Sequence, residues 1–217
     1  MNKLDNFKIN NNVAYFLGVL HSDGCIYTFN NKVTNRKQIR INLGVGKRSI
    51  PMSKKFAQIF LSSFGRTVNI RKVPNKESYV IQTSINRLWY LFKNWNNEKI
   101  PIEIQKNKIL FCTYLAGLID GDGHIKIKNN IDRILPQCRV RISSSHPLIP
   151  VGNLIKKYLN CAVHYYYVKT ENSVDTCFYV SKKNIYDVKK YVIANMVLPH
   201  KIDRFNEYLK KYESGRI

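Results

Sequence analysis

The sequence of 217 residues lacks several features that would assign it to a common class of protein. No apolar run approaches the roughly 18 residues that a membrane-spanning helix needs, and the N-terminal MNKLDNFKINNN contains no apolar signal core. The five histidines form no H-E-x-x-H motif, which removes the simplest zinc-hydrolase pattern. We therefore expect a protein that is not secreted and that does not enter a membrane.

Cysteine is also sparse, and its distribution excludes two further classes. The five cysteines are odd in number, widely spread and without a C-x-x-C pair: Cys25, Cys112, Cys138, Cys161 and Cys177. This pattern argues against a zinc module and against a disulfide framework. We expect buried free thiols instead.

Acidic residues are few compared with basic ones. The chain has 36 Lys and Arg against 14 Asp and Glu, which gives a formal charge of 36 − 14 = +22. Such an excess repels itself in a compact chain and usually has an anionic partner, so we expect the protein to bind nucleic acid. A solvated basic surface and a membrane surface are the alternatives, but no basic amphipathic stretch stands out to favour the membrane.

What the chain does contain is an internal repeat. The stretch YFLGVLHSDGCI at residues 15–26 resembles YLAGLIDGDGHI at residues 114–125, and Asp23 and Asp122 are offset by 122 − 23 = 99 residues. Strand-like and helix-like runs follow each Asp-Gly at similar spacing. The predicted order is therefore α-β-β-α-β-β-α, twice, as in a fused pseudo-dimer.

The predicted elements follow this repeat. In the first half we expect strands at 25–29, 38–45, 67–73 and 78–84, and helices at 54–65 and 86–95. In the second half we expect strands at 124–128, 138–143, 162–168 and 176–182, and helices at 152–161 and 184–193. Each half ends in a Pro-containing segment, at 100–108 and 198–205, and the sequence predicts domains at 1–103 and 104–217 with no Gly/Ser-rich linker between them.

Each repeated motif has two small residues four positions apart, Gly18 and Ser22 in the first and Gly117 and Gly121 in the second. Residues four apart share one face of a helix, so these positions allow two helices to approach backbone to backbone. We expect each helix to end at the motif Asp, with the following glycine, at position 24 or 123, in a left-handed cap.

Two helices that pair in this way bring Asp23 and Asp122 side by side. Carboxylates at the negative ends of two helix dipoles repel each other and favour protonation, and a divalent cation relieves this repulsion. Few, hard oxygen ligands suit Mg²⁺, which completes its shell with waters and substrate phosphates. The motif therefore predicts a metal-dependent site for phosphate chemistry.

These residues also resemble a known family. LAGLIDGDG (115–123) differs in one position from the LAGLIDADG signature of homing endonucleases and related intron maturases, and FLGVLHSDG (16–24) resembles a degenerate copy. The chain is thus similar to monomeric, two-motif members of that family. The resemblance implies an α+β protein of two pseudo-symmetric αββαββα halves, each with an antiparallel sheet, packed through the motif helices, with the sheets lying over the DNA major groove.

The resemblance also implies an activity and its residues. Asp23 and Asp122 would bind Mg²⁺, for which Mn²⁺ can substitute, and hydrolyse both strands of a long, asymmetric duplex DNA site, leaving short 3′ overhangs. Basic residues that assist catalysis are expected at Lys47, Lys106 and Lys201, with the place matching Lys47 in the second half at about Ser144. The expected protein is an intron-encoded monomer inside the cell, in the prokaryotic cytoplasm or nucleoid or in the organelle whose genome hosts the intron.

Residues that contact DNA are expected on the strand faces opposite the apolar ones, because Arg, Lys and Asn side chains read base edges or hold phosphates. The candidates are Tyr27, Arg40, Asn42, Arg48, Asn69, Arg71, Gln82, His124, Lys126, Lys128, Arg139, Arg141 and Ser143.

Two other functions remain open on the sequence alone. A maturase on the same scaffold would bind intron RNA and assist group I splicing, and should prefer structured RNA to duplex DNA. A DNA-binding relic would bind DNA without Mg²⁺-dependent cutting, although both motif Asp residues are retained.

Overall fold

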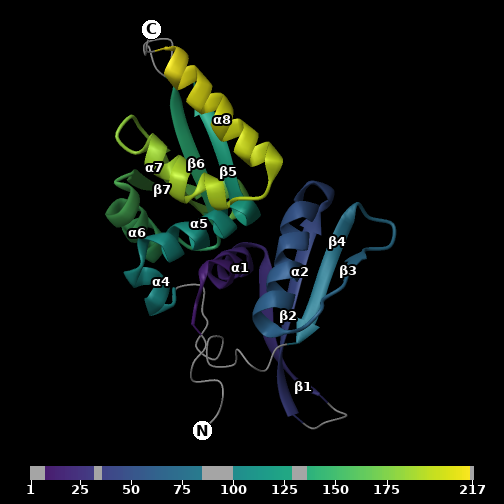
Figure 1. The fold of residues 1–217 in the computed structure, drawn as a ribbon. Coiled ribbons are helices and arrows are strands. Elements are labelled where there is room, and N and C mark those ends of the chain that lie inside the picture. Colours follow the sequence, from purple (N-terminus) through teal and green to yellow (C-terminus); the bar gives the residue numbers. More distant parts are fainter. Residues whose placement is uncertain (1–7, 32–35, 85–99, 129–135, 216–217) are drawn as a thin grey trace.

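A computed structural model describes residues 8–31, 36–84, 100–128 and 136–215. Its elements repeat along the chain as the sequence predicts (Figure 1). The first half contains α1 (Asn11–Ser22), β1 (Gly24–Asn31), β2 (Arg36–Gly46), α2 (Ile50–Phe64), β3 (Ile70–Lys72) and β4 (Ser78–Ser84). The second contains α5 (Lys108–Asp122), β5 (Gly123–Lys128), β6 (Gln137–Ser144), α6 (Ile149–Leu159), β7 (Ala162–Val168), β8 (Ser173–Val180) and α7 (Ile185–Tyr191).

Short elements complete the chain, and one long helix ends it. They are α4 (Ile102–Lys106), the 3-10 turns η1 (Lys47–Ser49), η2 (Lys169–Glu171) and η3 (Ile193–Asn195), and α8 (Pro199–Ser214). The helix that the sequence predicts at 86–95 lies outside the described residues, as does the boundary region up to residue 99.

The two sheets have the same strand order, and this confirms the pseudo-symmetry. Sheet A runs β1-β2-β4-β3 and sheet B runs β5-β6-β8-β7, with every neighbouring pair antiparallel. The register also repeats: Gly24 lies opposite Leu43 in sheet A and Gly123 opposite Ile142 in sheet B, with 142 − 43 = 99. The fold is therefore α+β, built from two related halves.

One face of each sheet is buried under helices and the other is open. The apolar residues of β2 and β6 are buried, namely Ile39, Ile41, Leu43 and Val45 in β2 and Val140 and Ile142 in β6. In Figure 1, α2 covers sheet A and α8 covers sheet B, which also packs against α6. The alternation in sequence follows from the pleat, because successive side chains of a strand point to opposite faces.

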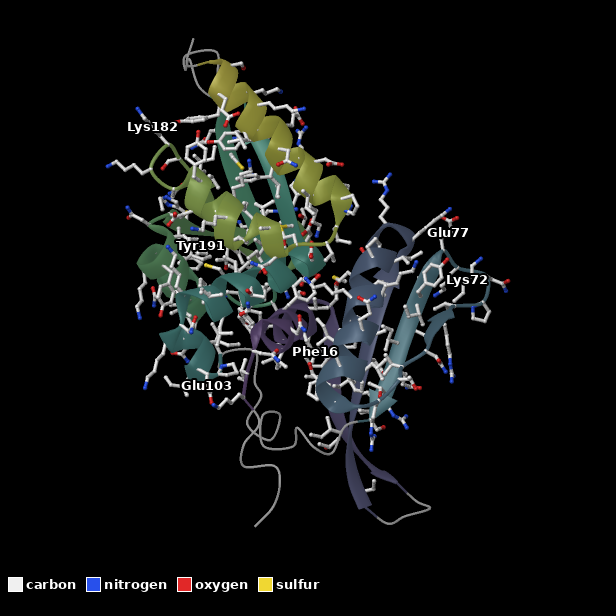
Figure 2. All side chains as sticks on the ribbon, in the orientation of Figure 1. Phe16, Lys72, Glu77, Glu103, Lys182 and Tyr191 are labelled. Atoms are coloured by element: carbon white, nitrogen blue, oxygen red, sulfur yellow. The ribbon has the colours of Figure 1, made fainter. Side chains whose placement is uncertain are left out.

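The motif helices α1 and α5 form the junction between the halves and lie together at the centre of the molecule (Figure 1). Each begins at an asparagine cap: the side chain of Asn10 accepts a hydrogen bond from the Val13 amide at 3.0 Å, and Asn107 caps α5 in the same way. Residues 13–20 of α1 and 111–120 of α5 are all buried, and Phe16 of α1, labelled in Figure 2, packs against α2.

Two glycines allow the backbones of α1 and α5 to touch. A Cβ atom on Gly18 would overlap the carbonyl oxygen of Tyr114, and one on Gly117 would overlap that of Tyr15. The contact is reciprocal, because Tyr15 and Tyr114 are themselves related by the repeat. Ser22 lies directly against Gly121, so all four small residues predicted at the interface lie in it.

The prediction of left-handed glycine caps is wrong. Gly123 is extended, with φ −78° and ψ 144°, and Gly24 has no positive φ either. Glycine is needed at both places for space, since a Cβ at Gly24 would lie 2.5 Å from the Leu20 carbonyl oxygen and one at Gly123 would meet the Ile119 carbonyl. The chain leaves each motif helix directly into a strand, and a side chain there would collide with the last turn.

Three smaller expectations need correction. The segment at 198–205 is the start of α8, whose buried Phe205, Tyr208, Leu209 and Tyr212 recur at helical spacing after a proline in the first turn. The third strand of sheet A is shorter than predicted, because only Ile70–Lys72 pair with β4. Cys25 is exposed, whereas the other four cysteines are buried free thiols as expected.

The close helix contact predicts a large cost for one methyl group. We expect Gly117→Ala to lower the free energy of unfolding by about 2 kcal/mol or more, because the helices must separate to admit the Cβ. Gly44→Ala is the control, since a Cβ there meets nothing within 4 Å. Chemical denaturation of both variants measures the difference, and equal stabilities would contradict the contact.

Candidate active site and nucleic-acid interface

The two motif carboxylates converge where α1 and α5 end. Asp23 is the C-terminal cap of α1, and Asp122 is the last residue of α5. Asp23 is half-buried, and its Oδ2 lies 3.2 Å from the point that a Cβ on Gly121 would occupy, next to Asp122 in the chain. Because β1 and β5 begin immediately after these residues, the carboxylates lie at the inner ends of both sheets.

These carboxylates resist ionisation together. Burial, and then the negative charge of Asp122, raise the pKa of Asp23 from its ordinary 3.8 to about 6, although Lys201 acts against the rise. Partial burial also raises the pKa of Asp122, and Lys201 again opposes the change. Ionisation of both carboxylates near neutral pH is therefore unfavourable, and a divalent cation bound between them would relieve the repulsion.

Lys201 is the cation that the structure places beside the pair. Its Nζ donates hydrogen bonds to the carbonyl oxygens of Ile119 at 2.7 Å, Asp120 at 2.7 Å and Gly121 at 2.9 Å, which are the last carbonyls of α5. Burial lowers the pKa of Lys201, while the three neighbouring Asp carboxylates raise it. A cation at this helix end offsets the negative end of the helix dipole.

Asp120 fixes the position of Lys201, and sequence reasoning missed it. Its buried carboxylate accepts hydrogen bonds from the Tyr15 hydroxyl at 2.6 Å, the Val197 amide at 2.8 Å and the Leu198 amide at 3.3 Å. Asp120 thus ties the start of α8 to the end of α5, three residues before Lys201. The repeated tyrosines, Tyr15 and Tyr114, are the signal in the sequence that could have indicated this cross-link.

The equivalent cross-link on the other side of the helix interface is made by different side chains. Tyr114 of α5 pairs through its hydroxyl with Nδ1 of His21, the residue that matches Asp120 in the repeat because 120 − 21 = 99. A carboxylate therefore stands on one side of the interface and an imidazole on the other. The two ends of the site share a backbone plan but not their charge.

A cavity of about 200 Å³ opens beside Asp122. Its polar lining comes from the ends of α1 and β6 and from the loop that follows β6: His21, Ser22, Ser143, Ser144, Ser145 and His146. Among the described residues that line the cavity there is no lysine, so Lys201 lies outside it.

The other two predicted basic residues, Lys47 and Lys106, are exposed. Lys47 begins η1 after β2, is exposed, and lies 3.4 Å from the Glu77 carboxylate. Its counterpart in the second half is His146 and not Ser144, because Ile50-Pro51 and Ile149-Pro150 follow the two residues at the same spacing. Lys106 is exposed on α4, at the far end of α5, and at 1.5 Å per helical residue it lies roughly 20 Å from Asp122.

The carboxylate pair suits a divalent cation that shares its ligands with a substrate. In the described part of the chain no three His, Cys, Asp or Glu side chains form a cluster able to hold a metal ion by themselves. Two carboxylates with raised pKa values suit Mg²⁺, since this ion keeps several waters and takes phosphate oxygens as further ligands. Asp23 and Asp122 are the residues that would hold it.

The open face of sheet A carries polar residues predicted to contact DNA. The strand register brings together Tyr27 opposite Arg40 and Asn42 opposite Gln82, with Asn42 Nδ2 3.5 Å from the Tyr27 hydroxyl. Arg71 belongs to the same face at the edge strand β3. The other two candidates lie outside the strands, Arg48 in η1 and Asn69 just before β3, and both are exposed.

The open face of sheet B is more basic. On it lie six predicted DNA-contacting residues: His124, Lys126 and Lys128 of β5 and Arg139, Arg141 and Ser143 of β6. The register adds a carboxylate, Asp175 of β8, opposite Ser143. Contact between these residues and DNA stays a prediction. Among the described helices, none combines the length and the apolar character needed to span a bilayer.

The raised pKa of Asp23 predicts how stability depends on pH in metal-free protein. A carboxyl with a higher pKa in the folded state binds protons preferentially there, so stability present near pH 4 is lost as the pH rises through about 6. Asp23→Asn should remove this loss and stabilise the metal-free protein at pH 7.5 by roughly 1 to 3 kcal/mol.

Thermal melts of both proteins in EDTA at pH 4 and pH 7.5 measure this effect. Asp187→Asn is the control, because Asp187 is an exposed carboxylate paired with Lys108 far from the site. A wild-type protein as stable as Asp23→Asn at pH 7.5 would refute the proposed repulsion.

Comparison with known proteins agrees with this architecture. Residues 115–212 match the family model described as LAGLIDADG endonuclease. No match is found among curated proteins.

Solved structures of similar fold include variants of the homing endonuclease I-DmoI, with 19% identity over 84% of this chain and 95% of that chain and a TM-score of 0.60. I-DmoI in complex with DNA and Ca is 17% identical over 91% and 97% of the two chains, with a TM-score of 0.61. The I-LtrWI LAGLIDADG homing endonuclease bound to target DNA is 11% identical over 95% and 91%, with a TM-score of 0.57. At these identities the likeness establishes the fold.

The family match and the internal repeat together cover both halves. The match includes the second motif and nearly all of the second half, and the first half repeats its motif, its strand order and its register. The second half of the chain is therefore similar to the LAGLIDADG endonuclease family, and the first half repeats its architecture.

Proposed function

We propose that this protein is a site-specific endonuclease that cuts both strands of a long, asymmetric duplex DNA target and leaves short 3′ overhangs. The observation that carries the proposal is the convergence of Asp23 and Asp122 where the two sheets meet. The similar structures of I-DmoI and I-LtrWI, solved with DNA, support a duplex substrate. The enzyme is an intron-encoded monomer that acts inside the cell, in the compartment of the genome that hosts its intron.

The reaction needs a divalent cation, Mg²⁺ or Mn²⁺, held by Asp23 and Asp122. A cation held there would supply activation of the attacking water and stabilisation of the leaving 3′ oxygen of the scissile phosphodiester. The chain's own residues position the carboxylates and the DNA. The motif helices hold the carboxylates at a fixed separation, and the basic open faces of the sheets hold the phosphate backbone on either side of them.

Lys201 contributes positive charge at the point where charge accumulates. Its Nζ is fixed by three carbonyl oxygens and interacts electrostatically with Asp23 and Asp122. A partly buried cation held in this way stabilises the extra negative charge that develops on the phosphate during hydrolysis. It does so without having to reorganise, because Asp120 already fixes the start of α8.

The pseudo-twofold arrangement accounts for cleavage of two strands by one chain. Each motif helix supplies one carboxylate, and each half supplies one sheet for one half of the target. Since the open faces of the sheets differ in charge and in side chains, the two half-targets differ, and the full target is asymmetric. A maturase role has no separate observation in its favour.

The decisive experiment incubates the protein with a randomised duplex library in Mg²⁺ or EDTA and sequences the cut ends. We expect Mg²⁺-dependent double-strand breaks at one long consensus. Asp23→Asn and Asp122→Asn should bind that consensus but lose cleavage by at least about a hundredfold, because neither retains the full carboxylate pair. Asp187→Asn is the matched acidic control.

Two outcomes would overturn the nuclease proposal. An uncut library with tight, sequence-specific DNA binding would indicate a relic, and preferential binding of structured intron RNA with assisted splicing would indicate a maturase.

Lys201 allows a separate prediction about rate and binding. Lys201→Met keeps the aliphatic stem but removes the charge, so we expect cleavage at saturating DNA to fall at least about tenfold while the affinity for DNA changes much less. Lys210→Met on the exposed side of the same helix is the control. Single-turnover cleavage and gel-shift titration separate the two effects, and an equal loss in both would assign Lys201 to DNA binding only.

A further inference from the structure

A single buried carboxylate lies within the basic open face of sheet B. Asp175 of β8 is 6% exposed, and the register places it opposite Ser143 and beside the pair formed by Arg141 and Cys177. Sequence reasoning assigned no role to Asp175. An acidic group on a surface that faces phosphates weakens binding, so its presence there requires an explanation.

Both oxygens of Asp175 are used within the sheet. Oδ2 lies 3.3 Å from Nη1 of Arg141, and Oδ1 accepts a hydrogen bond from the Ser143 hydroxyl at 2.6 Å. The Arg141 side chain is nevertheless 35% exposed. Its Nε is buried, and its Nη1 is the guanidinium nitrogen that contacts Asp175.

The fold does not require this network. The register aligns Arg141, Ser143 and Asp175 of sheet B with Asn42, Gly44 and Val80 of sheet A. Sheet A forms the same four strands in the same order without any of these charges. We therefore attribute the network to the function of sheet B and not to its folding, and only this half of the molecule has it.

A fixed arginine on this face is suited to one task. Arg binds guanine through O6 and N7 in the major groove with two hydrogen bonds, and this contact needs a defined orientation of the guanidinium. A free arginine loses side-chain entropy when it adopts that orientation, whereas one already held by a carboxylate loses less. An arginine that only neutralised phosphate would gain nothing from a neighbouring negative charge.

We propose that Arg141, positioned by Asp175 and Ser143, reads a guanine in the half of the target that lies against sheet B. The inference rests on the proposed function and names part of its substrate. Arg141 lies opposite His124, two residues after Asp122, so the guanine is close to the cleaved bonds. Asp175 is a positioning residue that itself contacts no base.

The test selects bound sequences from a duplex library that is randomised around the consensus, in EDTA, so that recognition is measured without cleavage. We expect Arg141→Lys and Arg141→Gln to lose the preference for guanine at one base pair by about ten- to a hundredfold, with other positions unchanged. Asp175→Asn should reduce the same preference at the same base pair. Ser143→Ala should reduce it less.

Controls separate this inference from other causes. Asn42→Ala, at the matching place in sheet A, should alter the opposite half of the consensus and leave the guanine preference intact. Circular dichroism melts show whether Asp175→Asn is folded, and if it is not, Ser143→Ala with the two Arg141 variants still tests the positioning.

Each contrary result has a distinct meaning. A uniform loss of affinity at all positions would make Arg141 a phosphate contact and overturn the proposal, as would a guanine preference that survives its replacement. If Asp175→Asn is folded and keeps the preference while the Arg141 variants lose it, the positioning role is wrong. A protein that selects no consensus at all would overturn the proposed function itself.

Discussion

The contact between α1 and α5 is the constraint on which the rest of the molecule depends. Gly18 and Gly117 let each helix rest against the other's carbonyl oxygens, and no larger residue fits. Because each helix ends at a motif Asp and passes directly into the first strand of its sheet, this contact sets two separations together. The first is between Asp23 and Asp122, and the second is between the two open faces. In the proposed endonuclease, the geometry of cleavage and the span of DNA that is read would thus be linked through one interface.

That interface also brings two carboxylates together at partly buried helix ends, where water solvates their charge poorly. Burial, and then the negative charge of Asp122, raise the pKa of Asp23, and burial raises the pKa of Asp122. Lys201 offsets part of this charge, because its Nζ donates hydrogen bonds to three carbonyl oxygens at the end of α5. Asp120 in turn holds the start of α8, the helix that carries Lys201. Lys201 opposes the raised pKa of all three neighbouring Asp side chains without cancelling it. The divalent cation of the proposed reaction would relieve the remaining repulsion.

The sequence predicts the elements whose pattern is local. Alternating apolar residues predicted the paired strands, and small residues four apart predicted the helix contact, because both depend on spacing along one element. Contacts between distant elements left no such pattern. Asp120 and Lys201 meet only because α8 folds back onto α5. The shared face of Asp175 and Arg141 depends likewise on the pairing of β6 with β8.

Fusion of the two halves in one chain permits their side chains to differ while the backbones match. A homodimer of one half would carry the same residue at both ends of the site and would read a symmetric target. In this chain the residues at equivalent positions of the repeat differ: Asp120 corresponds to His21, Lys47 to His146, and Arg141 to Asn42. The backbone contact of the motif helices tolerates this divergence, because it depends on glycine and on main-chain atoms. The helix interface keeps the backbone geometry of the two halves the same, whereas the side chains of each half can differ.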